Sequence, residues 1–452
     1  MGTIGRSFLS IPALSAIMLL LGGQALWAED SQRIISLPEA VRLAILNRPD
    51  LKAQFDRANS AREKIGEARA ANYPQLQASF QTVYGNSLFG FFLFPGYNYA
   101  DLNLLTVTLT QTIYDFGRTG SSVTENRWEY SREEAREKEM FSNTVRAVET
   151  DYFNLLSAQH QVKADEENLA DASSQLDRAR SRFHAGTGIV LDVTRARVNV
   201  ESARLQMIRE RDQVRSLGLD LARVMGFSGP ETLIAIDVDR DPNFMPHPDL
   251  LQDLALALEK RPEMIEATAR IHASEAILKN IKSQNYPSIS GLVQSFTAML
   301  PKSTLPIPYV PNNSPYSTFN VGGVVNIPIL EGGLVVHQTS RAHSDLSASI
   351  ETRRDINLQV TTNLKKAMLE IRDAGQRLKE ARTERMNAQK NESLVEEAYR
   401  VGSVHSVDVM DAQAMLRQAR ESVIQARYAL MIGYVDYQYA RGTLNPPAEG
   451  GP

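Results

Sequence analysis

The feature that most constrains this chain is an internal duplication. Arg48-Pro49 recurs as Arg261-Pro262 and Asn72-Tyr73-Pro74 as Asn285-Tyr286-Pro287, each displaced by 213 positions. Farther along the displacement is 216, and it relates Asp115-x-Gly117 to Glu331-x-Gly333, Phe183-x-x-Gly186 to Tyr399-x-x-Gly402, and Asp192-Val193 to Asp408-Val409. A constant offset over so long a span indicates that one unit was duplicated. We therefore predict a first repeat over 29–226 and a second over 249–442. The function is expected to reside in the structure that the two repeats form together.

Composition narrows the function classes. The net charge of −4 gives no reason to expect a nucleic-acid partner. The chain has no cysteine, which rules out disulfides, a thiolate nucleophile, cysteine metal sites and a lipid-modified cysteine. Its histidines do not have a metal-ligand spacing, and Gly186-x-Gly188 lacks the lysine of a phosphate loop. We expect neither an enzyme nor a cofactor or metal.

The first 28 residues have the layout of a secretory signal peptide. Arg6 precedes an uncharged stretch, 7–28, whose strongly apolar part is shorter than the about 20 residues of a spanning helix. Cleavage after Ala25 or after Ala28 fits the small residues there. The chain is therefore expected to be exported.

Each half contains the pattern of a long helical hairpin. Between Gly117 and Phe183 the apolar residues follow a four-three rhythm without a proline, as in Phe141, Val145, Val148, Tyr152 and Leu155. Glycines near 186 and 402 predict the turns, so the hairpins span 117–226 and 332–441. About 68 residues of helix would measure on the order of 100 Å. Residues 227–248 read as a linker with a short strand at 233–238, and 443–452 as a disordered tail.

Upstream of each hairpin lies a segment almost without charge. Asp101 is the single charged residue between Gln75 and Tyr114, and Lys302 the single one between Pro287 and Leu330. Apolar and neutral polar residues alternate there, which predicts strands at 75–84, 104–114, 288–297 and 317–329. Lysine or arginine on the lipid face at mid-bilayer would cost roughly 2–4 kcal/mol, so membrane strands explain the missing charge. A soluble sheet is the alternative, but its edges normally carry charge.

An aromatic cluster separates the first two predicted strands. Such a concentration is typical of the belt at the lipid headgroups, and its members are Phe89, Phe91, Phe92, Phe94, Tyr97 and Tyr99. Four strands cannot close a membrane barrel, because the smallest have about eight. Open edges are not tolerated in lipid, so copies must assemble. The residues alone leave two copies or three open.

These residues together resemble the TolC-like outer-membrane efflux proteins. The likeness runs from Leu37-Pro38-Glu39-Ala40 to Ala440-x-Gly442, and its strongest motifs are the paired tips, Phe183-x-x-Gly186-x5-Asp192 and Tyr399-x-x-Gly402-x5-Asp408. The resemblance implies a mainly α-helical, duplicated chain whose homotrimer forms a twelve-stranded β-barrel in the outer membrane of a Gram-negative bacterium and an α-barrel in the periplasm. It implies a channel of a tripartite efflux or type I secretion system. The partners would be a periplasmic adaptor protein, an inner-membrane pump of the RND, ABC or MFS type, and outer-membrane lipid.

The tips hold the candidate functional residues. Asp408 and Asp411 share one helix face and, in a three-fold assembly, would ring the periplasmic mouth as a cation-selective aperture; the alternative is that Asp408 only caps its helix. The resemblance pairs Tyr399 with Asp192, and it assigns adaptor docking to Gly186, Gly402, Phe183, Val193 and Val409. Val404 stands where the family has a basic residue, so we expect a less tightly latched aperture.

Two other classes fit parts of the pattern. A periplasmic adaptor carries a long hairpin, usually a single one, and a soluble coiled-coil scaffold keeps the heptads but should carry charge between Gln75 and Tyr114. The transported cargo is not encoded in any recognisable motif.

Overall fold

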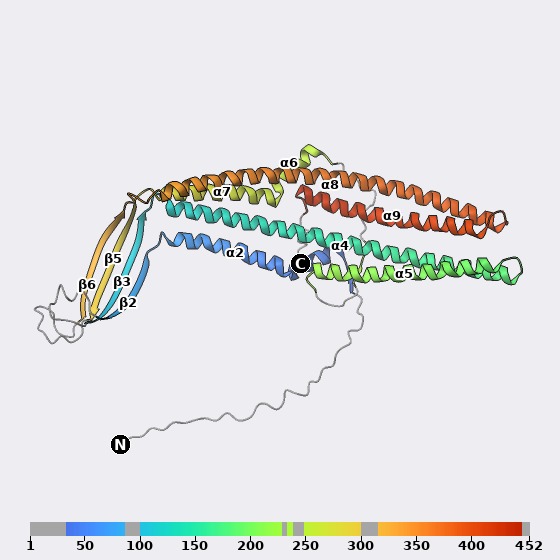
Figure 1. Cartoon of the computed structure of the whole chain (residues 1–452), viewed down its shortest axis with the longest axis horizontal. Coiled ribbons are helices and arrows are strands. Elements are labelled where there is room, and N and C mark those ends of the chain that lie inside the picture. Colours follow the sequence, from blue (N-terminus) through green and yellow to red (C-terminus); the bar gives the residue numbers. More distant parts are fainter. Residues whose placement is uncertain (1–32, 86–99, 228–232, 238–247, 300–314, 445–452) are drawn as a thin grey trace, which may run out of the picture.

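The computed structural model describes residues 33–85, 100–227, 233–237, 248–299 and 315–444. Four strands gather at one end, and two long helical hairpins run away from them to a pair of tips (Figure 1). The predicted signal peptide, the aromatic cluster 89–99 and residues 445–452 lie outside the described residues. Among the helices that are described, none is long and apolar enough to cross a membrane.

The two hairpins have matching lengths. Helix α4, Arg118–His184, and helix α8, Leu334–Arg400, each contain 67 residues. They are followed by return helices of similar length, α5 at Val190–Val224 and α9 at Ser406–Arg441. At about 1.5 Å per residue, each outgoing helix is on the order of 100 Å long. The return helices begin at Val190 and Ser406, two residues before Asp192 and Asp408.

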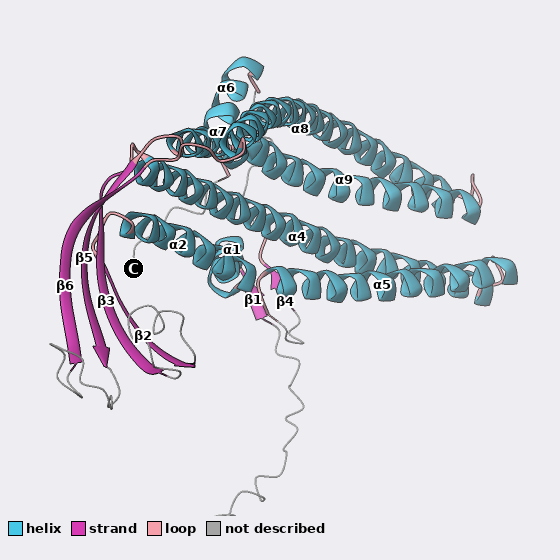
Figure 2. Cartoon of the chain, turned by 60° about the vertical axis from the view of Figure 1, so that its left-hand side comes forward, coloured by secondary structure: helices cyan, strands magenta, loops and turns pink. Residues whose placement is uncertain are grey.

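Each repeat also contains two shorter helices, joined at the duplicated Arg-Pro motif. These are α1 at Leu37–Asn47 with α2 at Pro49–Ala70, and α6 at Leu250–Lys260 with α7 at Pro262–Ser283. Proline suits the first helical position, because an N–H at that position would have no acceptor within the helix. Helices α2 and α5 both contact α4. Helices α7 and α9 both lie between α4 and α8. Together the helices form one curved layer (Figure 2).

The membrane-type strands form one antiparallel sheet in the order β2-β3-β5-β6. Their bounds are β2 Gln75–Gly85, β3 Ala100–Tyr114, β5 Ser288–Met299 and β6 Pro315–Asn326. We expected the last strand to continue to 329, and that was wrong. Pro328 has no N–H to donate to the ladder, so Ile327 and Ile329 lie beyond the strand.

A second, parallel sheet pairs β1, Arg33–Ile35, with β4, Leu233–Ala235. Strand β1 was not predicted, and β4 is shorter than the expected 233–238. The hydroxyl of Tyr152, on α4, lies 3.0 Å from the carbonyl oxygen of Ile35 and 2.7 Å from that of Ile236. Burial raises the pKa of Tyr152 to about 12, so its hydroxyl stays protonated and can donate. The pair of strands is thereby tied to the middle of α4.

The core follows the helical layer instead of forming one compact centre. The largest buried cluster surrounds Tyr152 and Phe153 and includes residues of α1, α5 and α9. A second cluster packs α8 against α6 and α9 around Leu364 and Leu378. Leu444 is 6% exposed and belongs to the first cluster, and the N–H of Thr443 donates to Gln438. The prediction that disorder begins at 443 was therefore wrong.

Candidate functional site

The register of the four-stranded sheet separates its two faces. Adjacent cross-strand rows are Leu76, Leu109, Val293 and Val321 on one face, and Gln77, Thr108, Gln294 and Asn320 on the other. Apolar side chains of the first face are exposed, with an exposed fraction of 71% for Leu76 and 70% for Val321. On the second face Gln294 donates to the Thr108 hydroxyl at 3.4 Å. The sheet therefore has one face suited to lipid and one suited to water, with little charge on either.

The sheet and the helical layer both have open edges. Strands β2 and β6 each pair on one side only, so each presents unpaired backbone groups. Helix α5 lies at one edge of the helical layer and exposes apolar side chains at multiples of seven residues, namely Leu191, Val198, Leu205 and Leu219. Helix α8 lies at the other edge and exposes Val336 and Ile350, which are fourteen residues apart, and also Leu358, which is eight residues beyond Ile350. A spacing of seven is that of a helix-packing seam.

The tip turns depend on two glycines in the left-handed conformation. Gly186 has φ 76° and Gly402 has φ 81°, which side chains with a Cβ rarely adopt. After them the N–H groups of Thr187 and Gly188 donate to Arg182, and that of Ser403 donates to Ala398. These bonds satisfy the last carbonyls of α4 and α8. The tips also expose apolar side chains, Phe183, Ile189, Val190 and Leu191 on the first and Val401 and Val407 on the second.

The acidic residues of the second tip have separate surroundings. The N–H of His405 donates to Asp408 Oδ2 at 2.8 Å, as part of a capping box at the start of α9. Asp408 thus caps its helix, as the alternative interpretation held, while remaining exposed. Asp411 is exposed as well, one turn farther along. The acidic pair lies on an accessible surface beside the turn.

The two hairpins contact each other through side chains near the tips. Ser406 Oγ donates to Asp192 Oδ1 at 2.6 Å. The guanidinium carbon of Arg182 lies 4.3 Å from the ring centroid of Tyr399, and Arg178 pairs with Glu396 at 3.3 Å. The expected pairing of Tyr399 with Asp192 is thus replaced by two separate contacts. Sequence reasoning missed four of these residues, Arg178, Arg182, Glu396 and Ser406, although basic residues four apart on α4 were a readable signal.

Two of the residues assigned to adaptor docking are oriented inward. Val409 is only 2% exposed, and Val193 packs against the cluster formed by α4 and α5. Val409 cannot make direct contact with a docked partner, because the apolar face of a helix turns toward its neighbour in the hairpin. Phe183, 42% exposed, remains available. Beside it, α4 and α8 line a hollow of about 1120 Å³ whose walls include Arg178, Arg182, Glu396 and Tyr399.

A model of the family described as "Outer membrane efflux protein" matches residues 40–226 and 254–436. The two matched segments coincide with the two repeats. The chain belongs to the outer membrane efflux protein family. It is therefore an outer-membrane protein of a Gram-negative bacterium, and the periplasmic-adaptor alternative is wrong.

Relatives within this family cover nearly the whole chain. Outer membrane protein TolC of Escherichia coli K12 is 23% identical over 91% of this chain and 83% of its own length. Outer membrane efflux protein BepC of Brucella suis is 24% identical over 94% of this chain and 90% of its own length. A crystal structure of CusC aligns with a TM-score of 0.77 at 19% identity, covering 90% of this chain and 92% of CusC. The open-state structure of MtrE from Neisseria gonorrhoeae aligns with a TM-score of 0.74 at 17% identity, covering 91% of this chain and 90% of MtrE.

Proposed function

We propose that this efflux-family chain is the protomer of a homotrimeric duct, with a twelve-stranded barrel in the outer membrane and a helical tunnel in the periplasm. The observation that carries the proposal is the four-stranded sheet, apolar on one face and neutral polar on the other, with open edges at β2 and β6. Unpaired strand edges are not tolerated in lipid, so β2 of one copy has to meet β6 of another.

The edges of the helical layer support the same head-to-tail assembly. The edge strand β2 and helix α5 belong to the first repeat, whereas β6 and α8 belong to the second. In a ring the exposed apolar side chains of α5 would then face those of α8 in the next copy. Such a heterologous contact gives a closed ring when the rotation between neighbouring copies closes, as a membrane barrel without open edges requires. Two copies would already supply eight strands, and the choice of three rests on the likeness to the family.

The tips would form the periplasmic entrance of this duct. Asp408 and Asp411 of the copies would surround the mouth, where like charges attract cations. The exposed Phe183 and the hollow between α4 and α8 offer an adaptor protein both apolar and charged contacts. Through that adaptor the duct would serve an inner-membrane pump of the RND, ABC or MFS type. The duct itself would be passive, opened by docking, in tripartite efflux or type I secretion.

The hypothesis of a looser latch is modified by the contacts at the tips. Val404 cannot supply the basic group, but Arg182 brings one to the same region from the other hairpin. A cation–π contact at an exposed site contributes about 0.5–1 kcal/mol. The exposed Arg178–Glu396 pair adds about 0–1 kcal/mol. We propose a latch made of several weak contacts, which docking of a partner could open.

The assembly can be tested with cysteine cross-links, because the natural chain has no cysteine. Single cysteines would be placed at Gln77 on β2 and at Asn320 on β6, on the water-suited face, and joined in detergent with a short bifunctional reagent. The double variant should give covalent dimers and trimers, and each single variant should not. A purified chain that is monomeric and soluble without detergent contradicts the proposal.

The acidic mouth is tested by ion currents in planar bilayers. Wild-type channels should prefer cations, and the Asp408→Asn/Asp411→Asn double variant should lose most of that preference while keeping its trimer. Asp177→Asn, at an exposed carboxylate on α4, is the matched control. An unchanged cation preference in the double variant would show that the acidic ring does not select cations. The proposed duct would not be affected by that result.

A further inference from the structure

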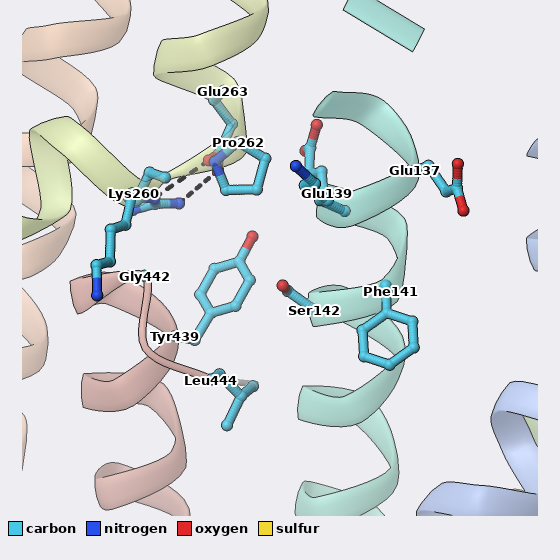
Figure 3. A pocket seen from close by; sticks show the side chains of 12 residues that line it. Glu137, Glu139, Phe141, Ser142, Lys260, Pro262, Glu263, Tyr439, Gly442 and Leu444 are labelled. Atoms are coloured by element: carbon cyan, nitrogen blue, oxygen red, sulfur yellow. Dashed lines mark hydrogen bonds and ion pairs between the residues drawn. The ribbon is translucent and has the colours of Figure 1, made fainter. Parts of the chain in front are cut away.

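A hollow of about 350 Å³ lies midway along the helices, where α4, the α6–α7 junction and the end of α9 meet (Figure 3). It is separate from the sheet and from the tips. Its walls combine six charged residues with apolar ones, which include Phe141 of α4, Pro262 of α7, Tyr439 of α9 and Leu444. Hollows of this size fall in the lower range of small-molecule sites.

A buried arginine lines this hollow, and one of its donors has no partner among the described residues. Arg261 is only 4% exposed, and its Nε and Nη2 donate to Glu263 at 3.2 and 2.5 Å. Arg261 Nη1 is buried and has no hydrogen-bond acceptor among the residues that the structure describes. Its guanidinium carbon lies 5.1 Å from the ring centroid of Tyr439. A buried donor without an acceptor lowers the stability of the fold, and most buried donors in folded proteins have an acceptor. The position therefore favours a ligand that brings an acceptor.

The burial of Arg261 is a feature of the second repeat alone. Its counterpart Arg48 makes the same kind of ion pair, with Asp50, but its side chain is 24% exposed, against 5% for Arg261. At the end of α9, Gly442 has φ 74°, and a Cβ there would lie 3.2 Å from Arg261 Cγ. The missing side chain lets the end of α9 lie close to the arginine, and Gly226 lies equally close to Arg48 in the first repeat, so this approach is common to both repeats. The duplicated fold does not require the burial of this donor, since the Arg48 side chain is partly exposed in the first repeat.

We propose that this hollow binds a small amphipathic carboxylate. The carboxylate accepts from Arg261 Nη1, while the apolar body lies against Tyr439, Phe141 and Leu444. The exposed Lys138 and Lys260 at the rim add positive potential. The inference does not depend on the proposed duct function.

Three carboxylates in the wall oppose an anion and set its affinity. Glu263 is already neutralised by Arg261 through two hydrogen bonds. Burial, followed by the charges of Glu263 and Glu266, raises the pKa of Glu139. Glu139 therefore gives up its charge more readily than an ordinary glutamate, which lowers the repulsion. Glu137 completes the acidic side of the wall.

The test uses the full-length chain in detergent and a fluorinated phenylalkanoate, para-fluorophenylbutyrate, observed by fluorine NMR. The probe signal should broaden and shift saturably with wild-type protein. The corresponding alcohol, which has the same apolar body without the charge, should bind at least tenfold more weakly, because a hydrogen bond to a charged group is lost. Equal binding of acid and alcohol overturns the proposal, since only apolar partition would remain.

Three variants locate the site. Arg261→Gln should weaken the acid roughly tenfold or more, and the repeat-matched Arg48→Gln should leave it unchanged. Ser142→Trp places a bulky ring in the hollow while leaving Arg261 in the sequence, and it should abolish binding. Thermal melting checks the fold of each variant, and if Arg261→Gln does not fold, Ser142→Trp decides. Wild-type affinity in a folded Ser142→Trp or Arg261→Gln protein overturns the proposal.

Discussion

The two repeats share a backbone plan but differ in how their long helices are held. At the middle of α4, Tyr152 lies in a cluster of large side chains and reaches the backbone of β1 and β4. The position 216 residues later on α8 is Met368, which only borders a smaller cluster. Duplication thus kept the helix length of 67 residues in both halves, while divergence tied the first hairpin more firmly at its middle. We therefore expect the second hairpin to be held less firmly at its middle than the first.

The largest effect expected from this difference is at Tyr152. Tyr152→Ala should destabilise the protein by about 3–5 kcal/mol, because a fully buried aromatic side chain and its hydrogen bonds are lost. Met368→Ala, the repeat-matched control at a partly buried site, should cost clearly less. Thermal melting of detergent-solubilised protein measures both. Equal losses would mean that the two hairpins are held equally.

A smaller effect, equal in the two repeats, is expected at the tip glycines. Gly186→Val and Gly402→Val should each cost roughly 1–3 kcal/mol, because valine disfavours positive φ. The cost should appear as local opening, measured by hydrogen exchange of the adjoining turns. A large loss at one tip and none at the other would contradict the equivalence of the two turns.

The third effect is a change in pH dependence where the first hairpin meets α9. Asp165 on α4 is 2% exposed, and burial raises its pKa above the usual value, with hydrogen bonds from Asn168 and Gln161 and the charge of Arg417 opposing. Glu421 of α9 also has a raised pKa, through burial and then the charge of Asp165. A carboxyl with a raised folded-state pKa stabilises the fold below its unfolded pKa and loses that stabilisation as pH rises through the folded value.

Stability of the wild type should therefore fall as pH rises from the acidic range toward neutral. Asp165→Asn should be more stable than wild type near neutrality and should show a flatter profile of melting temperature against pH. Asp177→Asn, at a side chain 75% exposed on the same helix, is the control. A profile for Asp165→Asn that matches wild type would show that this carboxyl does not couple the hairpins.

The smallest expected effect is at the contacts between the tips. Arg182→Ala should cost about 0.5–1 kcal/mol, the size of an exposed cation–π contact. Its visible consequence should be more frequent opening of single channels, because each copy in the ring loses one contact. Arg180→Ala, which removes an ion pair with Asp177 on the same helix, is the control. Wild-type gating in Arg182→Ala would exclude the contact from the latch.

Much of the fold was readable because it depends on near neighbours in the chain. Heptad spacing, tip glycines and strand alternation are properties of short windows, and duplication supplied each pattern twice. Prediction failed where a contact joins distant segments. Strand β1 has three residues and forms by pairing with β4, about 200 positions away. The bond between Ser406 and Asp192 spans 214 positions, so no local pattern could have shown it.

The candidate site divides in the same way. Sequence placed Asp408 and Asp411 beside the second turn, but the capping bond from His405 and the inward orientation of Val409 required coordinates. Sequence reasoning missed the Arg182–Tyr399 contact because it looked for the basic residue of the tip contacts at position 404. A basic group can reach the same place from another helix, and only packing decides which one does.

The sequence by itself determined a duplicated, exported chain with two long helical hairpins and strands that exclude charge, since periodicity and composition follow from the solvent each face meets. Tertiary structure decided which edges stay open, that Arg261 is buried while Arg48 is not, and which side chains join the hairpins. These outcomes depend on how closely distant backbones approach, and that distance is a property of the packed chain as a whole.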